Sequence, residues 1–187
     1  MEDGLKSNTV LSLIEARDGT VWAGTAYPGC LCRFDGEAFE AIPTPVPSVL
    51  KLLEDSKGRL WIGSGAHSNG ICCYDGQEFV TYTTRDGLPS NSVHSILEDD
   101  NGNIWIGTQD GLCRFDGERF IVHGEEHGAF SRNHKCSVKD TSGQLWFGTL
   151  RGGIYRTDGE HSQILTTQDG LPSNSVTGLL PQPDGSM

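Results

Sequence analysis

Six histidines are the side chains of this sequence best suited to acid–base chemistry or metal binding. His123 and His127 are four residues apart, but residues 123–127 lack the His-Glu-x-x-His order of a metalloprotease helix and lie among strand-forming residues. Residues 99–103 resemble the start of a calcium loop, but no distal glutamate completes it. No serine has a nucleophile elbow around it. We therefore predict a protein with no catalytic residue, no metal and no cofactor.

A second group of side chains is suited to binding a ligand rather than transforming it. They occupy four short stretches, each of which follows a Gly-Thr or Gly-Ser pair. A tyrosine ring can stack on a sugar ring, and polar side chains can hydrogen-bond to hydroxyl groups. The candidate ligand-binding residues are Tyr27, His67, Asn69, Gln109, Asp110 and Arg151. The alternative interpretation is that each is an ordinary solvated loop residue.

The four stretches hold equivalent places because the sequence repeats. A Gly-x-x-Trp block returns about every 40 residues and contains every tryptophan of the chain: Trp22, Trp61, Trp105 and Trp146. A repeat of this length built from strand-like segments is typical of a β-propeller. In that fold the variable stretches would share one face, which indicates a binding surface. We expect the tryptophan rings to pack between adjacent blades.

Each repeat contains four segments of five to seven residues, rich in β-branched and aromatic side chains and bounded by Gly, Asp or Asn. The pattern predicts an all-β propeller of about four four-stranded blades in an incomplete ring. The predicted blades cover about residues 8–42, 48–84, 91–123 and 132–167, and the first strand of a fifth blade falls at about 174–187. Asp-Gly pairs between the third and fourth segments favour type I′ hairpins.

The repeat pattern begins within a blade junction and stops within a motif. We therefore expect residues 1–187 to be a single partial propeller, a fragment whose unpaired blade faces favour self-association.

The net charge of −11 argues against partners with anionic surfaces. Nucleic acids and anionic membranes both recruit Lys and Arg, so we expect no nucleic-acid partner and no direct membrane contact. The sequence has no run of 18 apolar residues and no basic start followed by an apolar stretch. Its six cysteines do not have zinc-site spacing, and three of them recur at one repeat position, which favours free thiols in the core.

At these motifs the chain resembles the two-component regulator propeller repeat. Residues 88–116 contain Leu-Pro-Ser-Asn-x-Val, Ile-Leu-Glu-Asp, Gly-x-x-Trp-Ile-Gly-Thr and Gly-Leu-x-Arg-Phe in order. The fourth repeat departs from this pattern at His134, Thr157 and Ser162. The resemblance implies a sensor, because such propellers usually form the extracytoplasmic part of bacterial membrane-bound histidine kinases, including hybrid kinases that sense glycans.

For the parent protein, the resemblance implies a periplasmic sensor region with a small-molecule or oligosaccharide ligand. The partners implied are the remaining propeller blades and the signalling domains of the parent chain. The leading interpretation of the sequence is thus a non-enzymatic ligand-sensing propeller fragment.

Two other function classes stay open. A propeller can serve as a protein-interaction scaffold. Streptogramin lyase-like propellers also carry Gly-x-x-Trp repeats, and they use a His and a Glu on one face with a metal. Of the six histidines here, His67 alone lies on the expected ligand face.

Overall fold

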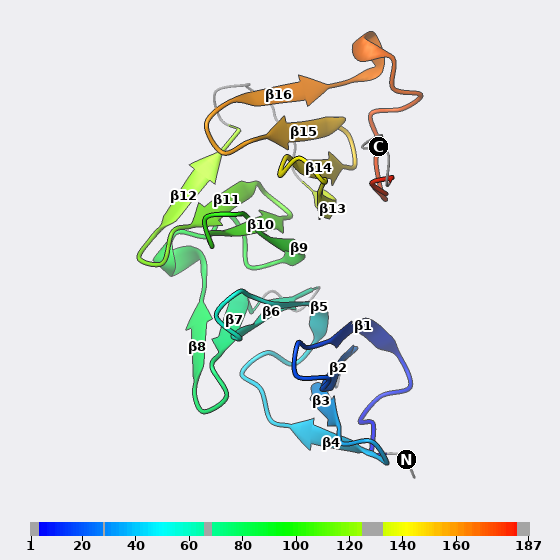
Figure 1. The fold of residues 1–187 in the computed structure, drawn as a ribbon, viewed down its shortest axis with the longest axis vertical. Helices are drawn as coiled ribbons and strands as arrows, with labels where there is room; N and C mark the ends of the chain where they lie inside the picture. Colours follow the sequence, from blue (N-terminus) through cyan, green and yellow to red (C-terminus); the bar gives the residue numbers. More distant parts are fainter. Residues whose placement is uncertain (1–3, 28, 66–68, 125–132, 183–187) are drawn as a thin grey trace. The chain divides into compact units, whose positions relative to one another are not determined.

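The computed structural model of the chain describes residues 4–27, 29–65, 69–124 and 133–182. In this part of the chain, sixteen strands form four separate four-stranded sheets, and in each sheet the strands lie side by side in sequence order (Figure 1). The prediction of an all-β protein with four four-stranded blades is confirmed. No helix in the described ranges is long and apolar enough to cross a membrane.

Two compact units, each containing two blades, make up the chain. The first comprises Met1–Arg85 with Asn91–Val93, and the second comprises Asp86–Ser90 with His94–Met187.

The first unit holds blades 1 and 2. Blade 1 consists of β1 (Val10–Glu15), β2 (Val21–Thr25), β3 (Leu31–Phe34) and β4 (Phe39–Ile42). Blade 2 consists of β5 (Val49–Glu54), β6 (Leu60–Ser64), β7 (Ile71–Tyr74) and β8 (Phe79–Tyr82), and the 3₁₀ turn η1 (Thr84–Asp86) follows it.

The second unit holds blades 3 and 4. Blade 3 consists of β9 (Val93–Glu98), β10 (Ile104–Thr108), β11 (Leu112–Phe115) and β12 (Phe120–His123). Blade 4 consists of β13 (His134–Lys139), β14 (Leu145–Thr149), β15 (Ile154–Thr157) and β16 (Ser162–Leu165), and the 3₁₀ turn η3 (Thr167–Asp169) follows it.

Trp22 and Trp105 pack between neighbouring blades of a unit, as the sequence predicts. Trp22 of blade 1 meets Tyr74 of blade 2 edge-on, with ring centroids 6.4 Å apart. Trp105 of blade 3 is fully buried, and its ring lies 5.6 Å from that of Phe147 in blade 4. Large rings at these positions bury much apolar area between blades, which stabilises each unit.

In three blades, an aspartate at the turn after the first strand accepts a hydrogen bond from the tryptophan of its own blade. The indole Nε1–H donates to a carboxylate oxygen of Asp55, Asp99 or Asp140 at 2.8 to 2.9 Å in blades 2, 3 and 4. The other oxygen of each carboxylate accepts two backbone N–H bonds from the following turn. Blade 1 has Ala16 at this position, so its tryptophan has no such acceptor.

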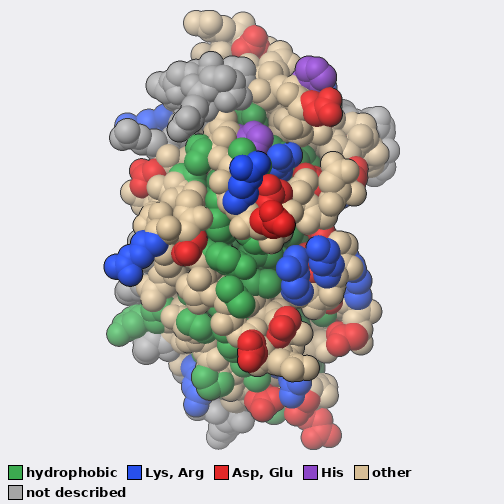
Figure 2. Space-filling model, turned by 90° about the vertical axis from the view of Figure 1, so that its left-hand side faces the viewer, with side chains coloured by type: hydrophobic (Ala, Val, Ile, Leu, Met, Phe, Trp, Pro, Cys, Tyr) green, Lys and Arg blue, Asp and Glu red, His purple; other side chains and the backbone are tan. Residues whose placement is uncertain are grey.

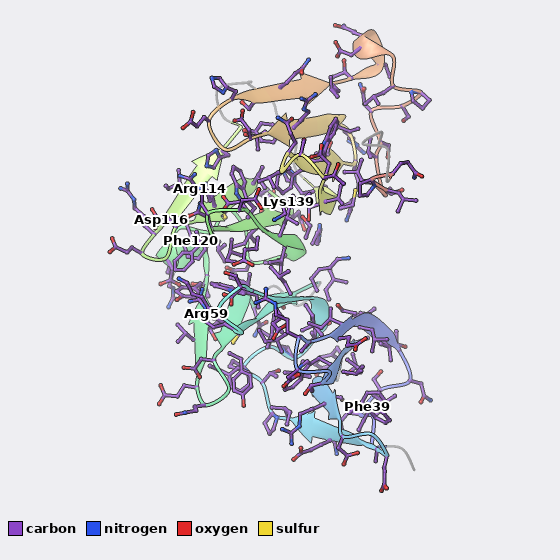
Figure 3. The ribbon with its side chains drawn as sticks, in the orientation of Figure 1. Phe39, Arg59, Arg114, Asp116, Phe120 and Lys139 are labelled. Carbon is purple, nitrogen blue, oxygen red and sulfur yellow. The ribbon has the colours of Figure 1, made fainter. Side chains whose placement is uncertain are left out.

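These contacts determine the ionisation of the three aspartates. Burial opposes the charged carboxylate, but the hydrogen bonds from the indole and the turn outweigh burial and hold the pKa of each below its ordinary value. In blade 2, Arg59 adds a charge-assisted bond from Nε at 2.7 Å to Asp55 (Figure 3). The motif is therefore built around an ionised carboxylate.

The Asp-Gly pairs do not form the predicted type I′ hairpins. That turn needs positive φ at both central residues, whereas among the described residues of these turns only the glycines, such as Gly36 at 105°, have positive φ. Each loop instead has four residues, and the aspartate carboxylate closes it. In blade 3, Asp116 accepts the N–H groups of Glu118 and Arg119 at 3.0 Å, immediately before Phe120 begins β12 (Figure 3). The prediction overlooked the side chain as a turn-closing acceptor.

A glycine near the end of the second strand marks where the next repeat docks on blades 1 and 4. A Cβ placed on Gly24 would lie 2.4 Å from the side chain of Val49, the first residue of β5. On Gly148 it would lie 2.8 Å from the side chain of Val176. The first valine of the predicted fifth repeat therefore packs on blade 4 as Val49 packs on blade 1.

Residues 174–182 form no strand in the structure, so the first strand of a fifth blade stays a prediction. The start of this segment nevertheless makes the same backbone hydrogen bond as the start of an earlier repeat. The Gly153 N–H donates to the Asn174 carbonyl at 2.9 Å, and in blade 2 the Gly70 N–H donates to the equivalent Asn91 carbonyl at the same distance.

Candidate functional site

The variable loops between the second and third strands are anchored by a buried hydroxyl. The anchoring residues are the last residues of the second strands, and all four are completely buried: Thr25, Ser64, Thr108 and Thr149. In blade 4 the Thr149 hydroxyl donates to the Gly153 carbonyl at 3.0 Å and accepts the Gly152 N–H at 2.8 Å. In blade 4 the threonine of the Gly-Thr pair thus fixes both ends of the loop through its backbone.

In the first unit, the candidate residues lie on the β2–β3 and β6–β7 loops. Tyr27 is 60% exposed. Asn69 is half-buried, and its backbone N–H donates to Ser64 Oγ at 3.2 Å. His67, the candidate on which an enzyme interpretation would depend, lies outside the described residues.

In the second unit, the structure brings two candidate loops together. Asn133, which has a left-handed φ of 73°, accepts the Leu150 N–H with its carbonyl at 3.2 Å, and its own N–H donates to the Gln109 carbonyl. This residue bridges the β10–β11 loop and the β14–β15 loop. Gln109, Asp110 and Arg151 are therefore exposed side chains at one edge of blades 3 and 4.

Two residues that the prediction did not include lie at the same edge. His94 and Lys135 are the second residues of β9 and β13, and Lys135 Nζ lies 3.4 Å from His94 Nδ1. Lys135 follows the bridging Asn133 by two positions, so it lies beside the candidate loops. The residue pairing of β13 with β14 is irregular at Lys135, as that of β5 with β6 is at Leu50. Such a bulge redirects a side chain out of the regular alternation of the strand.

The sequence held a signal for this pair. Blades 1 and 2 carry leucine at the equivalent position, Leu11 and Leu50, and blades 3 and 4 replace it with titratable side chains. A comparison of the repeats column by column would have found the change. The sequence pattern predicts apolar first strands, and these two titratable side chains depart from it.

The described residues also contain shallow depressions away from the candidate loops. One of about 430 Å³ is lined by Gln144, Arg156, Asp158 and His161 among others, and one of about 480 Å³ lies at the equivalent turns of blade 1. Asp158 accepts backbone N–H bonds from His161 and Glu160, and these lower the pKa of its carboxyl to about 2. An acid this strong remains an anion at neutral pH, and a turn-closing acceptor requires that form.

Within the described ranges, no group of three or more His, Cys, Asp or Glu side chains is arranged to hold a metal ion.

The cysteines are free thiols, and all except the half-buried Cys136 are buried. One face of the molecule shows acidic and basic side chains interspersed (Figure 2). The side chains named at the edge of blades 3 and 4 can form hydrogen bonds and charge pairs.

Comparison with protein families identifies the repeat. The model of the two-component regulator propeller matches residues 4–27, 45–66 and 87–110, each of which runs from a blade junction through the Trp motif. No curated protein matches the sequence.

Solved structures of several kinds share the fold. An extracellular domain assigned to the hybrid two component system BT3049 of B. thetaiotaomicron is 22% identical with a TM-score of 0.84, over 97% of this chain and 26% of that one. Virginiamycin B lyase from Staphylococcus aureus is 19% identical with a TM-score of 0.69, over 86% of this chain and 57% of that one. PorZ, a surface component of the type-IX secretion system of Porphyromonas gingivalis, is 16% identical with a TM-score of 0.68, over 90% of this chain and 29% of that one.

At these identities the likeness establishes the fold, since propellers with quite different activities share it. The chain spans about a quarter of the length of the extracellular sensor domains that it resembles. The four blades and the three family matches lead to one conclusion: the chain is a β-propeller region in which blades 1, 2 and 3 carry the two-component regulator propeller repeat.

Proposed function

We propose that this chain is the ligand-sensing propeller region of a bacterial two-component sensor, and that it binds an oligosaccharide or related small molecule without transforming it. The observation that carries the proposal is that some positions of each repeat are constant and others vary. The tryptophan and the buried hydroxyl recur in all four blades and the aspartate in three of them, whereas the loops anchored by the hydroxyl differ in length and composition and carry the exposed polar side chains.

The extracellular sensor domains that share this fold at TM-scores of 0.84 and 0.74 support the signalling role. By the same reasoning, the parent protein would place this region outside the cytoplasm. The remaining blades and the signalling domains of the parent would then be its partners.

Binding is best tested with a panel of oligosaccharides and isothermal titration calorimetry on the full chain. Arg151→Ala should weaken the binding of any ligand found by about tenfold or more, because a charge-assisted hydrogen bond contributes about 1.5–3 kcal/mol. Arg119→Ala is the matched control, since Arg119 has a side chain 78% exposed in the β11–β12 turn and forms only a local pair with Asp116. Equal effects of the two substitutions, or no saccharide binding at all, would contradict the proposal.

The enzyme alternative is favoured by one observation, the shared fold with virginiamycin B lyase. Incubating the chain with the streptogramin quinupristin and a divalent cation tests it by mass spectrometry. We expect the substrate mass and retention time to stay unchanged. Metal-dependent turnover that His67→Ala abolishes would replace the sensor proposal with a lyase.

A further inference from the structure

The contact between His94 and Lys135 joins blades 3 and 4 by two basic side chains. Lys135 Nζ carries three N–H donors and no acceptor, so at 3.4 Å the ammonium donates to His94 Nδ1. That bond leaves the imidazole proton on Nε2 and leaves the ammonium two further donors. Both side chains are half-buried, so an interaction formed there is less screened than one on the open surface.

Among the residues that the structure describes, no carboxylate balances the charge of Lys135. Within the described residues Lys135 forms no ion pair, although the chain carries 25 acidic residues against 14 Lys and Arg. Lys139, four positions further along β13, shows the ordinary arrangement, because its Nζ lies 2.7 Å from a carboxylate oxygen of Asp100 in blade 3 (Figure 3). The two lysines therefore lie towards opposite ends of the same strand, and within the described ranges Lys139 alone of the two has a carboxylate partner.

We propose that His94 and Lys135 form a subsite for an anionic group, a carboxylate or a sulfate, carried by the ligand of the loop edge. This inference rests on the proposed ligand-sensing function and adds the charge of the ligand to it. The anion would accept from the ammonium of Lys135, and hydroxyl groups of the same ligand would reach the polar side chains of the adjoining loops. An anion held by charge-assisted bonds at a half-buried position gains more than it would in bulk water.

The neighbouring loops set the orientation of such a ligand. Asp110 and Arg151 are exposed and lie on the two loops that Asn133 bridges. The carboxylate of Asp110 would repel an anion, whereas the guanidinium of Arg151 would attract one. We therefore expect the anionic group to bind towards the first strands, and the neutral part of the ligand to extend over the β10–β11 loop.

Backbone amide chemical shifts of the ¹⁵N-labelled chain can test this proposal. The probes are sodium glucuronate, glucose 6-sulfate, glucose and sodium acetate at matched ionic strength. We expect glucuronate or glucose 6-sulfate to shift the amides of His94, Lys135 and Leu150 saturably, with an apparent Kd at least about tenfold below that of glucose. The stronger of the two charged sugars identifies the anion as carboxylate or sulfate.

Two matched substitutions distinguish binding at the subsite from a general effect of the positive charge of the chain. Lys135→Met keeps most of the aliphatic stem and removes the charge, and it should reduce binding of the charged sugar to the level of glucose. Lys139→Met removes one positive charge from the same strand and should leave binding within about twofold of the unsubstituted chain. Lys135→Arg should retain part of the preference.

The outcomes distinguish this inference from the proposed function. Glucose binding as tightly as the charged sugars, or equal losses from both lysine substitutions, would overturn the anion subsite and leave saccharide sensing intact. Acetate producing the same saturable shifts as glucuronate would reduce the site to one for simple anions and overturn the role in ligand recognition. No response to any sugar would count against the proposed function itself.

Discussion

Removing the carboxylate of Asp55 should destabilise the first unit more than any other single change at a turn of blade 2. Its side chain is completely buried and accepts four hydrogen bonds at 2.7 to 2.9 Å, from the backbone N–H groups of Lys57 and Arg59, from Arg59 Nε and from Trp61 Nε1. In Asp55→Ala the indole N–H of the fully buried Trp61 loses its acceptor. A buried donor left without an acceptor costs about 1–3 kcal/mol, and the loss of the Arg59 bond adds to that.

The sum is about 3 kcal/mol, within the range for breaking a buried charged contact by deleting one partner. With a urea m-value of about 2 kcal/mol/M, the unfolding midpoint should fall by about 1.5 M. Asp55→Asn should also destabilise, because the amide offers one acceptor where the site supplies donors to both oxygens. Urea titration followed by tryptophan fluorescence measures each midpoint.

Asp18→Ala is the matched control. Asp18 lies in the corresponding turn of blade 1, is exposed, and accepts a single backbone bond from Thr20 at 2.8 Å. Its removal should change the midpoint little. If Asp55→Ala and Asp18→Ala shifted the midpoint equally, the argument that the buried carboxylate stabilises the blade through Trp61 would be refuted.

The remaining predictions concern pH, packing and thiol chemistry. The three aspartates that bind tryptophan have pKa values in the folded protein below the ordinary 3.8. Their stabilisation of the fold should therefore be complete above about pH 4 and should disappear as the pH falls through these lowered pKa values. Urea midpoints measured at a series of acidic pH values would detect the loss. Gly148→Ala should displace Val176 from blade 4, because the added methyl group would meet the Val176 side chain. The Val176 N–H, which donates to the Thr149 carbonyl at 2.7 Å, should then lose its protection from hydrogen exchange. Gly178→Ala is the control and should leave that protection unchanged, because the space around its added methyl group is open. Burial raises the pKa of the Cys113 thiol, so a thiol reagent should modify the half-buried Cys136 well before Cys113 in the folded chain, and equal rates would contradict the packing described for blade 3.

The architecture could be predicted because the Gly-x-x-Trp motif combines several local signals in one short block. Tryptophan supplies the buried area between blades, the glycine before Thr or Ser allows close approach of the next repeat, and Asp-Gly marks the hairpin. Each of these depends on residues close together in sequence. The hairpin type was predicted wrongly because Asp116 and its equivalents close the loop with a side-chain oxygen, a contact that dipeptide preferences do not describe.

The candidate site was harder to predict because it depends on contacts between repeats. Gln109, Asp110 and Arg151 were recognised as loop residues, but the bridge through Asn133 joins segments about 20 to 40 positions apart. His94 and Lys135 meet across two blades, and the bulge that turns Lys135 out of the strand alternation has no strong signature in a single sequence. Such pairings follow from tertiary packing and not from local propensity.

The buried hydroxyls have a consequence for how the specificity of this protein could change. The hydroxyl groups of Thr108 and Thr149 hydrogen-bond to backbone groups of the loops that follow them. The side chains of these loops therefore contribute little to the strand pairing. Insertions and substitutions between these anchors can accumulate without unfolding the blade. If the chain senses a ligand as proposed, ligand preference and foldability depend on separate sets of residues, and selection can act on one while the other stays unchanged.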